Sequence, residues 1–318
     1  MQEFCQKLHR EISGKLGDTV TVELKEIIKN NGVRFHGLVF SGEDGNIAPT
    51  IYLEGYYPEY RNGKALSEIR EEILQLYEGV RNRQQIDIRF FENYDAVQTG
   101  TCFKLINRAR NEELLKRVPS IPYLDLSIVF FYYYRNELLG DGTILIHNSH
   151  MKAWGVTVTE LYERALYNTE RLFAPELLRM EQLLKGELPE GRQLQEGIPL
   201  REEKQLQEEI QLQEAKDMEE ENVAESMLVL TNGQRQYGAA SILYTQYLQL
   251  LSAKLNRNLF ILPSSVHEVI LLPDCGLERE PLKQMVEEVN ETQVAAEEVL
   301  SDSVYYYDRE KKSVRVIL

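Results

Sequence analysis

An acidic, repetitive segment at residues 186–221 divides this chain, and it constrains the possible fold more than any other feature. The tetrapeptide Gln-Leu-Gln-Glu occurs there three times, at 193–196, 205–208 and 211–214. The segment contains 12 acidic and 4 basic residues, two prolines and no aromatic residue. Such a stretch cannot bury enough apolar surface to offset the entropy that is lost when a chain is ordered. We therefore predict an acidic low-complexity linker, or alternatively a regulatory helix at 200–218.

The same segment predicts two lobes. A chain of 318 residues is long enough for two domains, and its composition of 43% apolar and 27% charged residues supports hydrophobic cores. We expect an N-terminal lobe at 1–185, possibly built of two submodules at 1–92 and 93–185, and a C-terminal lobe at 222–318. The expected fold class is α+β, with antiparallel sheets and helices packed on one face of them.

Hydrophobic periodicity predicts the elements of the N-terminal lobe. Alternation at Val20, Val22 and Leu24 indicates a strand, and Asn31-Gly32 is typical of a tight hairpin turn. A second turn is expected at Asp44-Gly45. A helix is expected at 64–81 with Ile69, Ile73, Leu74, Leu76 and Tyr77 on its buried side. Strands are expected at 86–91, 102–106, 124–134 and 143–147. A helix with a Thr157/Glu160 capping box and another running from Pro175 to Lys185 complete the lobe.

The C-terminal lobe has equally regular signals. A nearly uncharged stretch at 237–255 predicts a buried helix, because it is too polar for a membrane span. Apolar runs at 259–262 and 269–272 predict a strand pair. A helix is expected from about Pro281, and a hairpin is expected at 304–318.

Charge and cysteine content narrow the possible partners and location. A net charge of −15 repels phosphate backbones, so nucleic acid is an unlikely partner. Three cysteines in no paired motif are typical of reduced thiols in a cytoplasm. The N-terminus has helical spacing of its apolar residues and lacks the apolar block of a signal peptide. We therefore expect a cytoplasmic protein with no membrane partner.

Reactive side chains are concentrated between the two C-terminal strands, at Ser264, Ser265, His267 and Glu268. Nucleophilic catalysis needs a hydroxyl within reach of a base that a third group orients. Residues two apart on a strand share a face, so Ser265 and His267 could cooperate. No glycine-flanked nucleophile elbow is present, and serines that follow proline commonly satisfy turn backbone. The structural interpretation is therefore favoured over the catalytic one.

Two histidines, His147 and His150, form a second candidate. At a spacing of three they can meet on one helical turn, and imidazole is a good zinc ligand. A third ligand would have to come from His267 or Glu268. Loop histidines explain the pair without a metal, and this interpretation is again favoured.

Tyrosine is unusually frequent, with 18 residues against one tryptophan. The cluster Tyr52, Tyr56, Tyr57 and Tyr60 lies among loop-forming residues. Tyrosine is at home in half-buried strands, but it is also enriched at protein interfaces. We regard this cluster as a candidate interaction surface.

Several common motifs are missing from the sequence. There is no P-loop, no convincing dinucleotide-binding glycine pattern, no kinase motif and no EF-hand loop. No cofactor is evident as a result, and the common nucleotide-dependent enzymes are disfavoured.

Four blocks of sequence carry a resemblance to a known family. They are KLINRARNEELLKRVPSIPYLDLSIVF at 104–130, LPSSVHEVILLP at 262–273, VEEVNETQ at 286–293 and LSDSVYYYD at 300–308. The chain resembles an uncharacterised protein family, a domain of unknown function from anaerobic Gram-positive bacteria. The resemblance implies a bacterial cytoplasmic protein and brings no activity, cofactor or site residue.

These observations lead to two hypotheses of different classes. The leading one is a non-catalytic intracellular protein-interaction protein, an adaptor or accessory factor whose partner is another protein. The alternative is a metal-dependent or Ser/His hydrolase with a site formed by the 147–150 and 264–268 loops, which requires these loops to converge.

Overall fold

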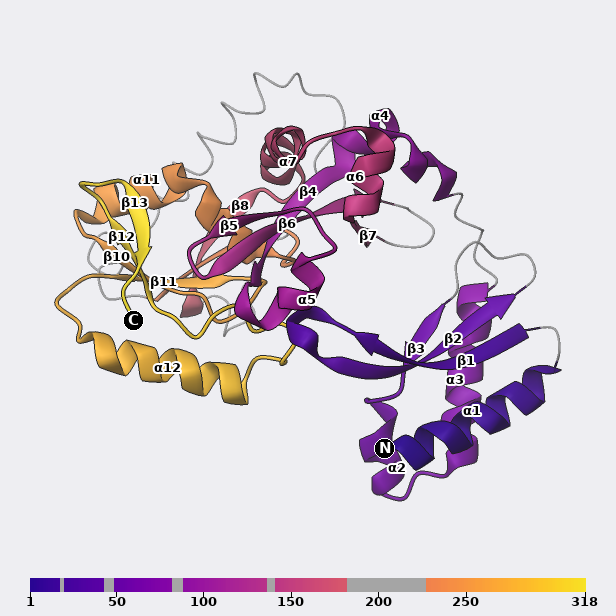
Figure 1. Cartoon of the computed structure of the whole chain (residues 1–318). Helices are drawn as coiled ribbons and strands as arrows, with labels where there is room; N and C mark the ends of the chain where they lie inside the picture. The colour runs from indigo at the N-terminus through magenta and orange to yellow at the C-terminus, as the bar shows by residue number, and fades with distance from the viewer. Residues whose placement is uncertain (18–19, 43–48, 82–87, 136–140, 182–226) are drawn as a thin grey trace. The chain divides into compact units, whose positions relative to one another are not determined.

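The computed structural model describes residues 1–17, 20–42, 49–81, 88–135, 141–181 and 227–318 (Figure 1). The acidic segment at 186–221 and the expected Asp44-Gly45 turn lie outside these residues. The chain forms two compact units, and neither is continuous in sequence. Unit 1 is Met1–Gly100 with Tyr132–Val156, and unit 2 is Thr101–Phe131 with Thr157–Leu318. The fold class is α+β, with antiparallel sheets and helices packed on them, as predicted.

A three-stranded sheet begins unit 1. Its strands, in the order β1-β2-β3, are β1 (Val20–Ile28), β2 (Arg34–Gly42) and β3 (Thr50–Tyr52). Asn31 and Gly32 have φ angles of 60° and 70° in the turn between β1 and β2. These left-handed angles and the hairpin are as predicted, but the turn is not a tight two-residue one, because the last strand pair is Ile28 with Arg34.

Helices cover one face of this sheet. They are α1 (Gln2–Leu16), the short α2 (Tyr56–Arg61) and α3 (Leu66–Arg81). Figure 1 shows α1 and α3 on the same side of the sheet, where Phe4, Leu8, Ile69 and Ile73 are among the residues of a shared core. The prediction that Leu76 belongs to the buried side of α3 is wrong, since it is 50% exposed. Its helical position turns it away from the stripe formed by Ile69, Ile73 and Tyr77.

The rest of unit 1 is made of short elements. They are η3 (Ile88–Glu92), α4 (Tyr94–Val97), η4 (Gln98–Gly100), β7 (Gly142–Leu145) and α6 (Asn148–Trp154). The strand predicted at 86–91 is wrong for its described part, which is a 3₁₀ helix. Phe90 and Phe91 pack against Tyr132 and Trp154 rather than entering a ladder.

Unit 2 begins with most of a second sheet. Its strands are β4 (Thr101–Asn107), β5 (Ser120–Tyr123) and β6 (Leu126–Tyr134), in the order β4-β6-β5. Strand β7 pairs with β6, and β7 and the end of β6 from Tyr132 belong to unit 1. The helical turns η5 (Ala109–Asn111) and α5 (Glu112–Leu115) follow β4. Helix α7 (Val158–Leu172) packs on β4, where the Phe103 N–H donates to Thr169 Oγ1 at 3.0 Å. The predicted Thr157/Glu160 capping box is present at the start of α7.

A six-stranded sheet forms the centre of unit 2. Its order is β13-β12-β10-β11-β9-β8. The strands are β8 (Pro175–Arg179), β9 (Leu228–Asn232), β10 (Leu259–Leu262), β11 (Val269–Pro273), β12 (Tyr305–Asp308) and β13 (Ser313–Val316). The predicted strand pair β10/β11 and the final hairpin β12/β13 are confirmed.

The helix predicted to begin at Pro175 is wrong, because these residues form β8. All five residues of β8 pair with β9, so hydrogen bonds to a distant strand outweigh the local helical signal. Proline is tolerated there because β8 is an edge strand and Pro175 is its first residue. Strands β8 and β9 precede and follow the acidic segment, and both belong to unit 2.

Helices complete unit 2. The helix predicted at 237–255 divides into η6 (Gly238–Leu243) and α11 (Thr245–Leu255), because Tyr244 between them has a non-helical backbone with a φ of −87° and a ψ of 76°. Helix α12 (Arg279–Thr292) lies along the sheet in Figure 1. Its Leu282 and Val286 pack in one core with Phe260, Leu262 and Tyr306.

Candidate functional site

A pocket in unit 2 lies beside the connection between β10 and β11. It consists of two adjoining cavities of about 360 Å³ and about 300 Å³. Five residues line both cavities: Arg235, Ser265, Glu268, Gln293 and Val294. Strands β9, β10 and β11 contribute lining residues, as do Val289 in α12 and Gln293 directly after it. The volume is that of a small-ligand site.

The larger cavity is mainly apolar. Its lining includes Met180, Val229, Leu262, Ile270, Val289 and Val294, with hydroxyl groups from Thr231 and Ser264. Val229 and Thr231 are two residues apart on β9, so their side chains share one face of the sheet. Ser264 and Glu268 lie outside β10 and β11, in the connection between them, and the neighbours Ser264 and Ser265 both line this cavity.

The smaller cavity is polar. Its lining is Arg235, Ser265, His267, Glu268, Gln293, Val294 and Glu298. Three of the four catalytic candidates from the sequence are therefore brought together here, and the fourth, Ser264, lines the adjoining cavity. Arg235, Gln293 and Glu298 come from distant segments, and sequence analysis missed them.

The backbone of the 263–268 connection is fixed by neighbouring loops. The Val266 N–H donates to the Glu298 carbonyl at 2.9 Å, and the Leu300 and Ser301 N–H groups donate to the Ser264 and Pro263 carbonyls at 2.9 and 3.0 Å. These bonds satisfy polar groups that a buried loop would otherwise leave unpaired. The pocket walls are therefore held in place by main-chain contacts.

The ring of His267 is oriented by its own surroundings. Its Nδ1 accepts from the Tyr237 N–H at 3.3 Å, so the neutral ring carries its proton on Nε2. Nε2 lies 3.4 Å from Glu298 Oε1, and the ring stacks on Tyr237 with centroids 6.0 Å apart. Ser265 Oγ accepts from the main-chain N–H of His267 at 3.0 Å. Ser265 therefore contacts the backbone of His267, and the ring is engaged elsewhere.

Glu268 has a perturbed acidity. Burial raises the pKa of its carboxyl, and the proximity of His267, Ser265 and Arg235 opposes this only in part. A carboxyl group that keeps its proton to higher pH can donate a hydrogen bond as well as accept one. Perturbed groups in clefts are enriched at functional sites.

Arg235 lies on a strained loop between β9 and η6. Its φ is 54° and that of Tyr237 is 56°, the left-handed region that side-chain-bearing residues rarely adopt. Asn232 stabilises this loop, since its Oδ1 accepts from the Gln234 and Gln236 N–H groups at 3.1 and 3.3 Å. Arg235 Nη2 lies 3.4 Å from Glu176, whereas its Nη1 is shielded from solvent and has no hydrogen-bond partner among the described residues. The only sequence signal for this loop is the Asn232-Gly233 pair directly after an apolar strand.

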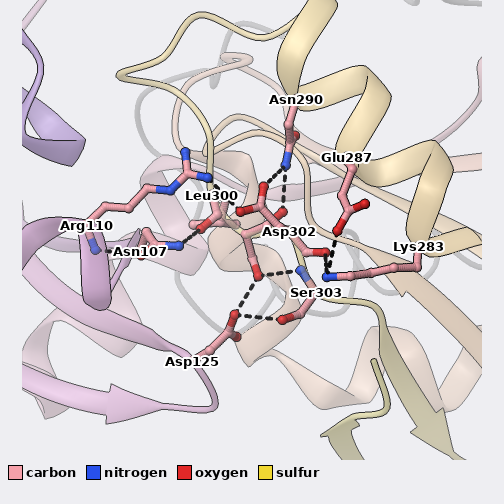
Figure 2. A network of polar contacts seen from close by, with 10 residues as sticks. Asn107, Arg110, Asp125, Lys283, Glu287, Asn290, Leu300, Asp302 and Ser303 are labelled. Atoms are coloured by element: carbon pink, nitrogen blue, oxygen red, sulfur yellow. Dashed lines mark hydrogen bonds and ion pairs between the residues drawn. The ribbon is translucent and has the colours of Figure 1, made fainter.

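A polar network braces the loop that carries Glu298 (Figure 2). Asn290 Nδ2, on α12, donates to the Ser301 carbonyl at 2.9 Å and to Asp302 Oδ1 at 2.8 Å. Lys283 Nζ donates to the Asp302 carbonyl at 2.7 Å, and Arg110 pairs with Asp302 Oδ2 at 2.6 Å. The loop is therefore bonded both to α12 and to the segment after β4.

Asp125 is a second anchor of that loop, as Figure 2 shows. Its Oδ2 accepts from Ser301 Oγ at 2.5 Å and from Ser303 Oγ at 3.1 Å, and its Oδ1 accepts from the Tyr305 hydroxyl. Leu124, the preceding residue, has a φ of 52° in the β5–β6 turn. This strained turn places the carboxylate against the loop.

The two remaining candidate histidines lie in unit 1. His150 Nδ1 accepts from the His147 N–H at 3.0 Å, and its ring packs on Phe91 and Trp154. Burial and the nearby His147 lower the pKa of His150. Within the described ranges, no group of three His, Cys, Asp or Glu residues is placed to hold a metal ion. The predicted metal site, with His147 and His150 in one unit and His267 in the other, stays a prediction.

The candidate tyrosine surface is partly covered within its own unit. Tyr56, Tyr57 and Tyr60 pack against the core of unit 1, and the Phe4 ring lies 5.5 Å from Tyr57 and 5.0 Å from Tyr60. Lys29 Nζ lies 4.1 Å from the centre of the Tyr52 ring. These rings stabilise unit 1, and a contact role for their exposed edges stays a prediction.

Comparison with known proteins gives one positive result. The family model "Family of unknown function (DUF5688)" matches residues 1–309. The chain belongs to this family. The resemblance predicted from the four sequence blocks is thereby confirmed at the level of the family. No curated protein and no solved structure matches the chain. Membership of DUF5688 brings no activity, so the pocket has to be interpreted from its chemistry.

Proposed function

We propose that the protein is a non-catalytic binding protein, an adaptor or accessory factor that recognises a partner protein through the unit 2 pocket. The observation that supports this most is the arrangement of Ser265, His267 and Tyr237. The His267 Nδ1 atom accepts a hydrogen bond from the Tyr237 N–H, and Ser265 Oγ accepts one from the main-chain N–H of His267. The pocket thus offers binding groups without a serine hydroxyl paired to the histidine ring.

The hydrolase alternative is less well supported. A serine nucleophile needs a ring nitrogen of histidine to accept its proton. In the neutral His267 ring the available nitrogen is Nδ1, which already accepts from Tyr237, while Nε2 carries the proton next to Glu298. Hydrolysis would therefore require the His267 ring to give up its hydrogen bond with Tyr237 and its contact with Glu298.

Location and partner type are further parts of this proposal. No helix among the described residues is long and apolar enough to cross a membrane. The net charge of −15 disfavours nucleic acid as the partner. A cytoplasmic location in an anaerobic Gram-positive bacterium fits the reduced cysteines and the sequence resemblance.

A ligand screen with a blocked pocket tests the proposal. A library of peptides and small molecules is screened by thermal shift against the full chain and two variants. Val294→Trp places an indole at the wall shared by both cavities. Leu250→Trp makes a comparable change on α11, where the leucine side chain is 55% exposed. We expect hits that stabilise the wild type and Leu250→Trp, but not Val294→Trp, because only the latter fills the pocket.

The same compounds are then tested for turnover. We expect each one to be recovered unchanged after incubation with the protein. Hydrolysis of a hit that is lost in both Ser265→Ala and His267→Gln would refute the non-catalytic proposal in favour of the hydrolase. If Val294→Trp abolishes the binding of none of the hits, the pocket is not the recognition site.

A further inference from the structure

We propose that the pocket binds the carboxyl-terminal residue of a partner protein, with an apolar final side chain. This inference rests on the proposed binding function and specifies its ligand. The terminal carboxylate would pair with Arg235, the final side chain would enter the apolar cavity, and the preceding peptide would leave through the polar cavity.

The carboxylate is assigned from the state of Arg235. Its guanidinium pairs with Glu176 at 3.4 Å and lies near the Glu268 carboxyl, and Nη1 has no hydrogen-bond partner among the described residues. A guanidinium presents a planar fork that matches a carboxylate with two parallel hydrogen bonds. The side chain is 32% exposed and lines both cavities, so a rotation of the guanidinium would turn Nη1 toward a ligand.

The apolar side chain is assigned from the larger cavity. Six apolar residues line it between the sheet and α12, and it adjoins the cavity that contains His267 and Glu298. Both cavities share Arg235, so a carboxylate at Arg235 lies next to an apolar chamber. A single apolar residue such as leucine, valine or methionine fits this combination of groups.

Acceptors in the polar cavity favour a peptide over a simple fatty acid. Glu298 and Gln293 line this cavity, and both offer oxygen atoms to N–H donors. A peptide carries such donors next to its terminal carboxylate, whereas a fatty acid has none. Phosphate is disfavoured relative to a carboxylate, because it would bring an additional negative charge close to Glu176 and Glu298.

A comparison of peptide acids with peptide amides tests the inference. Short fluorescein-labelled peptides ending in leucine, valine, methionine or phenylalanine are titrated with the full chain by fluorescence anisotropy. Each peptide is made with a free carboxylate and as the amide. We expect at least one acid to bind about tenfold or more tightly than its amide, as a charge-assisted pair would produce.

Two variants locate the interaction. Arg235→Gln should abolish the preference for the acid, because it removes the guanidinium. Arg279→Gln makes the same change at an exposed position of α12 and should retain it. Equal binding of acid and amide by the wild type, or an acid preference that survives Arg235→Gln, would overturn the inference.

Further ligands test whether the peptide itself is needed, beyond a carboxylate joined to an apolar group. Free leucine and 4-methylpentanoate carry the carboxylate and the apolar group without a peptide. If either binds as tightly as the best peptide acid, the peptide assignment is wrong. If no peptide binds although the library contains hits that Val294→Trp abolishes, this inference fails and the proposed function stands. If neither peptides nor library compounds bind, both fail.

Discussion

Asp125 accepts a hydrogen bond from the hydroxyl of Tyr305, a residue 180 positions further along the chain. The carboxylate lies in the β5–β6 turn, and the tyrosine begins β12 in the six-stranded sheet. Burial and Asp125 itself raise the pKa of Tyr305, which keeps the hydroxyl protonated as a donor. The bond therefore links the β5–β6 turn directly to the six-stranded sheet.

Removal of this carboxylate should destabilise the protein. Asp125→Ala leaves the hydroxyls of Ser301, Ser303 and Tyr305 without their shared acceptor. Hydrogen bonds to charged groups contribute about 1.5–3 kcal/mol each, and the three share one acceptor, so we expect a loss of about 2–4 kcal/mol. Chemical denaturation of the wild type and the variant measures it.

Two tyrosine variants provide the comparison for Asp125. Tyr305→Phe should cost about 1–2 kcal/mol. Tyr306→Phe, which removes a bond to Asp274, should cost less, because Tyr306 is less completely buried. In a double-mutant cycle Asp125→Ala and Tyr305→Phe should be coupled, and strict additivity would contradict a direct bond.

Gly238 should not tolerate even an alanine. A Cβ atom there would lie 2.4 Å from the His267 carbonyl oxygen and 2.4 Å from Thr231 Oγ1. Relief of this clash would displace the backbone under the pocket, at a cost of about 3 kcal/mol. Thermal unfolding of Gly238→Ala should therefore begin well below that of the wild type.

Gly79→Ala is the matched control for this substitution. Gly79 lies within α3, and a Cβ atom added there would have no atom within 4 Å among the described residues outside its own helix backbone and chain neighbours. Alanine there should be neutral or stabilising by up to about 1 kcal/mol through helix propensity. Equal effects of the two substitutions would show that packing at Gly238 is not the cause.

Glu268→Gln should change how stability depends on pH. Burial raises the pKa of the Glu268 carboxyl in the folded protein above its value of 4.5 in the unfolded chain. Between these two values the folded state binds more protons, so the wild type loses stability as pH rises through this window. Glutamine does not titrate. The variant should therefore gain stability relative to the wild type between about pH 4 and about pH 7.

Unfolding measurements at both pH values test this prediction. Glu291→Gln, which makes the same chemical change on the exposed face of α12, serves as the reference. A difference between Glu268→Gln and wild type that is the same at both pH values would mean that burial does not perturb the carboxyl.

The three cysteines should react at different rates. Burial raises the pKa of Cys102 to about 12 and also raises that of Cys5, whereas Cys275 is exposed. Because the thiolate is the nucleophile, a chromogenic aromatic disulfide should modify one thiol quickly and the other two only after denaturation. Cys275→Ser should eliminate the fast phase, and a remaining fast phase would contradict the burial of the other two.

Local sequence patterns were sufficient where an element is defined by its own residues. The Asn31-Gly32 turn, the Thr157/Glu160 capping box and the β10/β11 pair all follow from residues that are close in sequence. The strand at Pro175 was missed because its pairing partner β9 lies on the far side of the acidic segment. Propensity carries no information about such a partner.

The same limit applies to the site. Strand alternation predicted that Ser265 and His267 could share a face, and both line the polar cavity. Glu268 lines it as well, because the connection between β10 and β11 is not a regular strand. Arg235 and Gln293 could not be assigned to the pocket, because only the packed sheet and α12 bring them there. The four blocks that carried the family resemblance also meet in this region. Each block contributes one residue to a set of hydrogen bonds around Ser301. Ser301 belongs to the last block, and it is bonded to Asp125, Pro263 and Asn290 from the other three.

The pairing of β8 with β9 affects how the protein would respond to a break in the chain between them. Arg179 is paired with Leu228, and the Met180 N–H donates to the Met227 carbonyl at 3.0 Å. The chain thus leaves the sheet and returns to it at neighbouring positions. Because the cost of closing a loop grows only with the logarithm of its length, insertions or deletions between these strands should be inexpensive. A single proteolytic cut there would yield two fragments that remain associated in native buffer and separate only in denaturant.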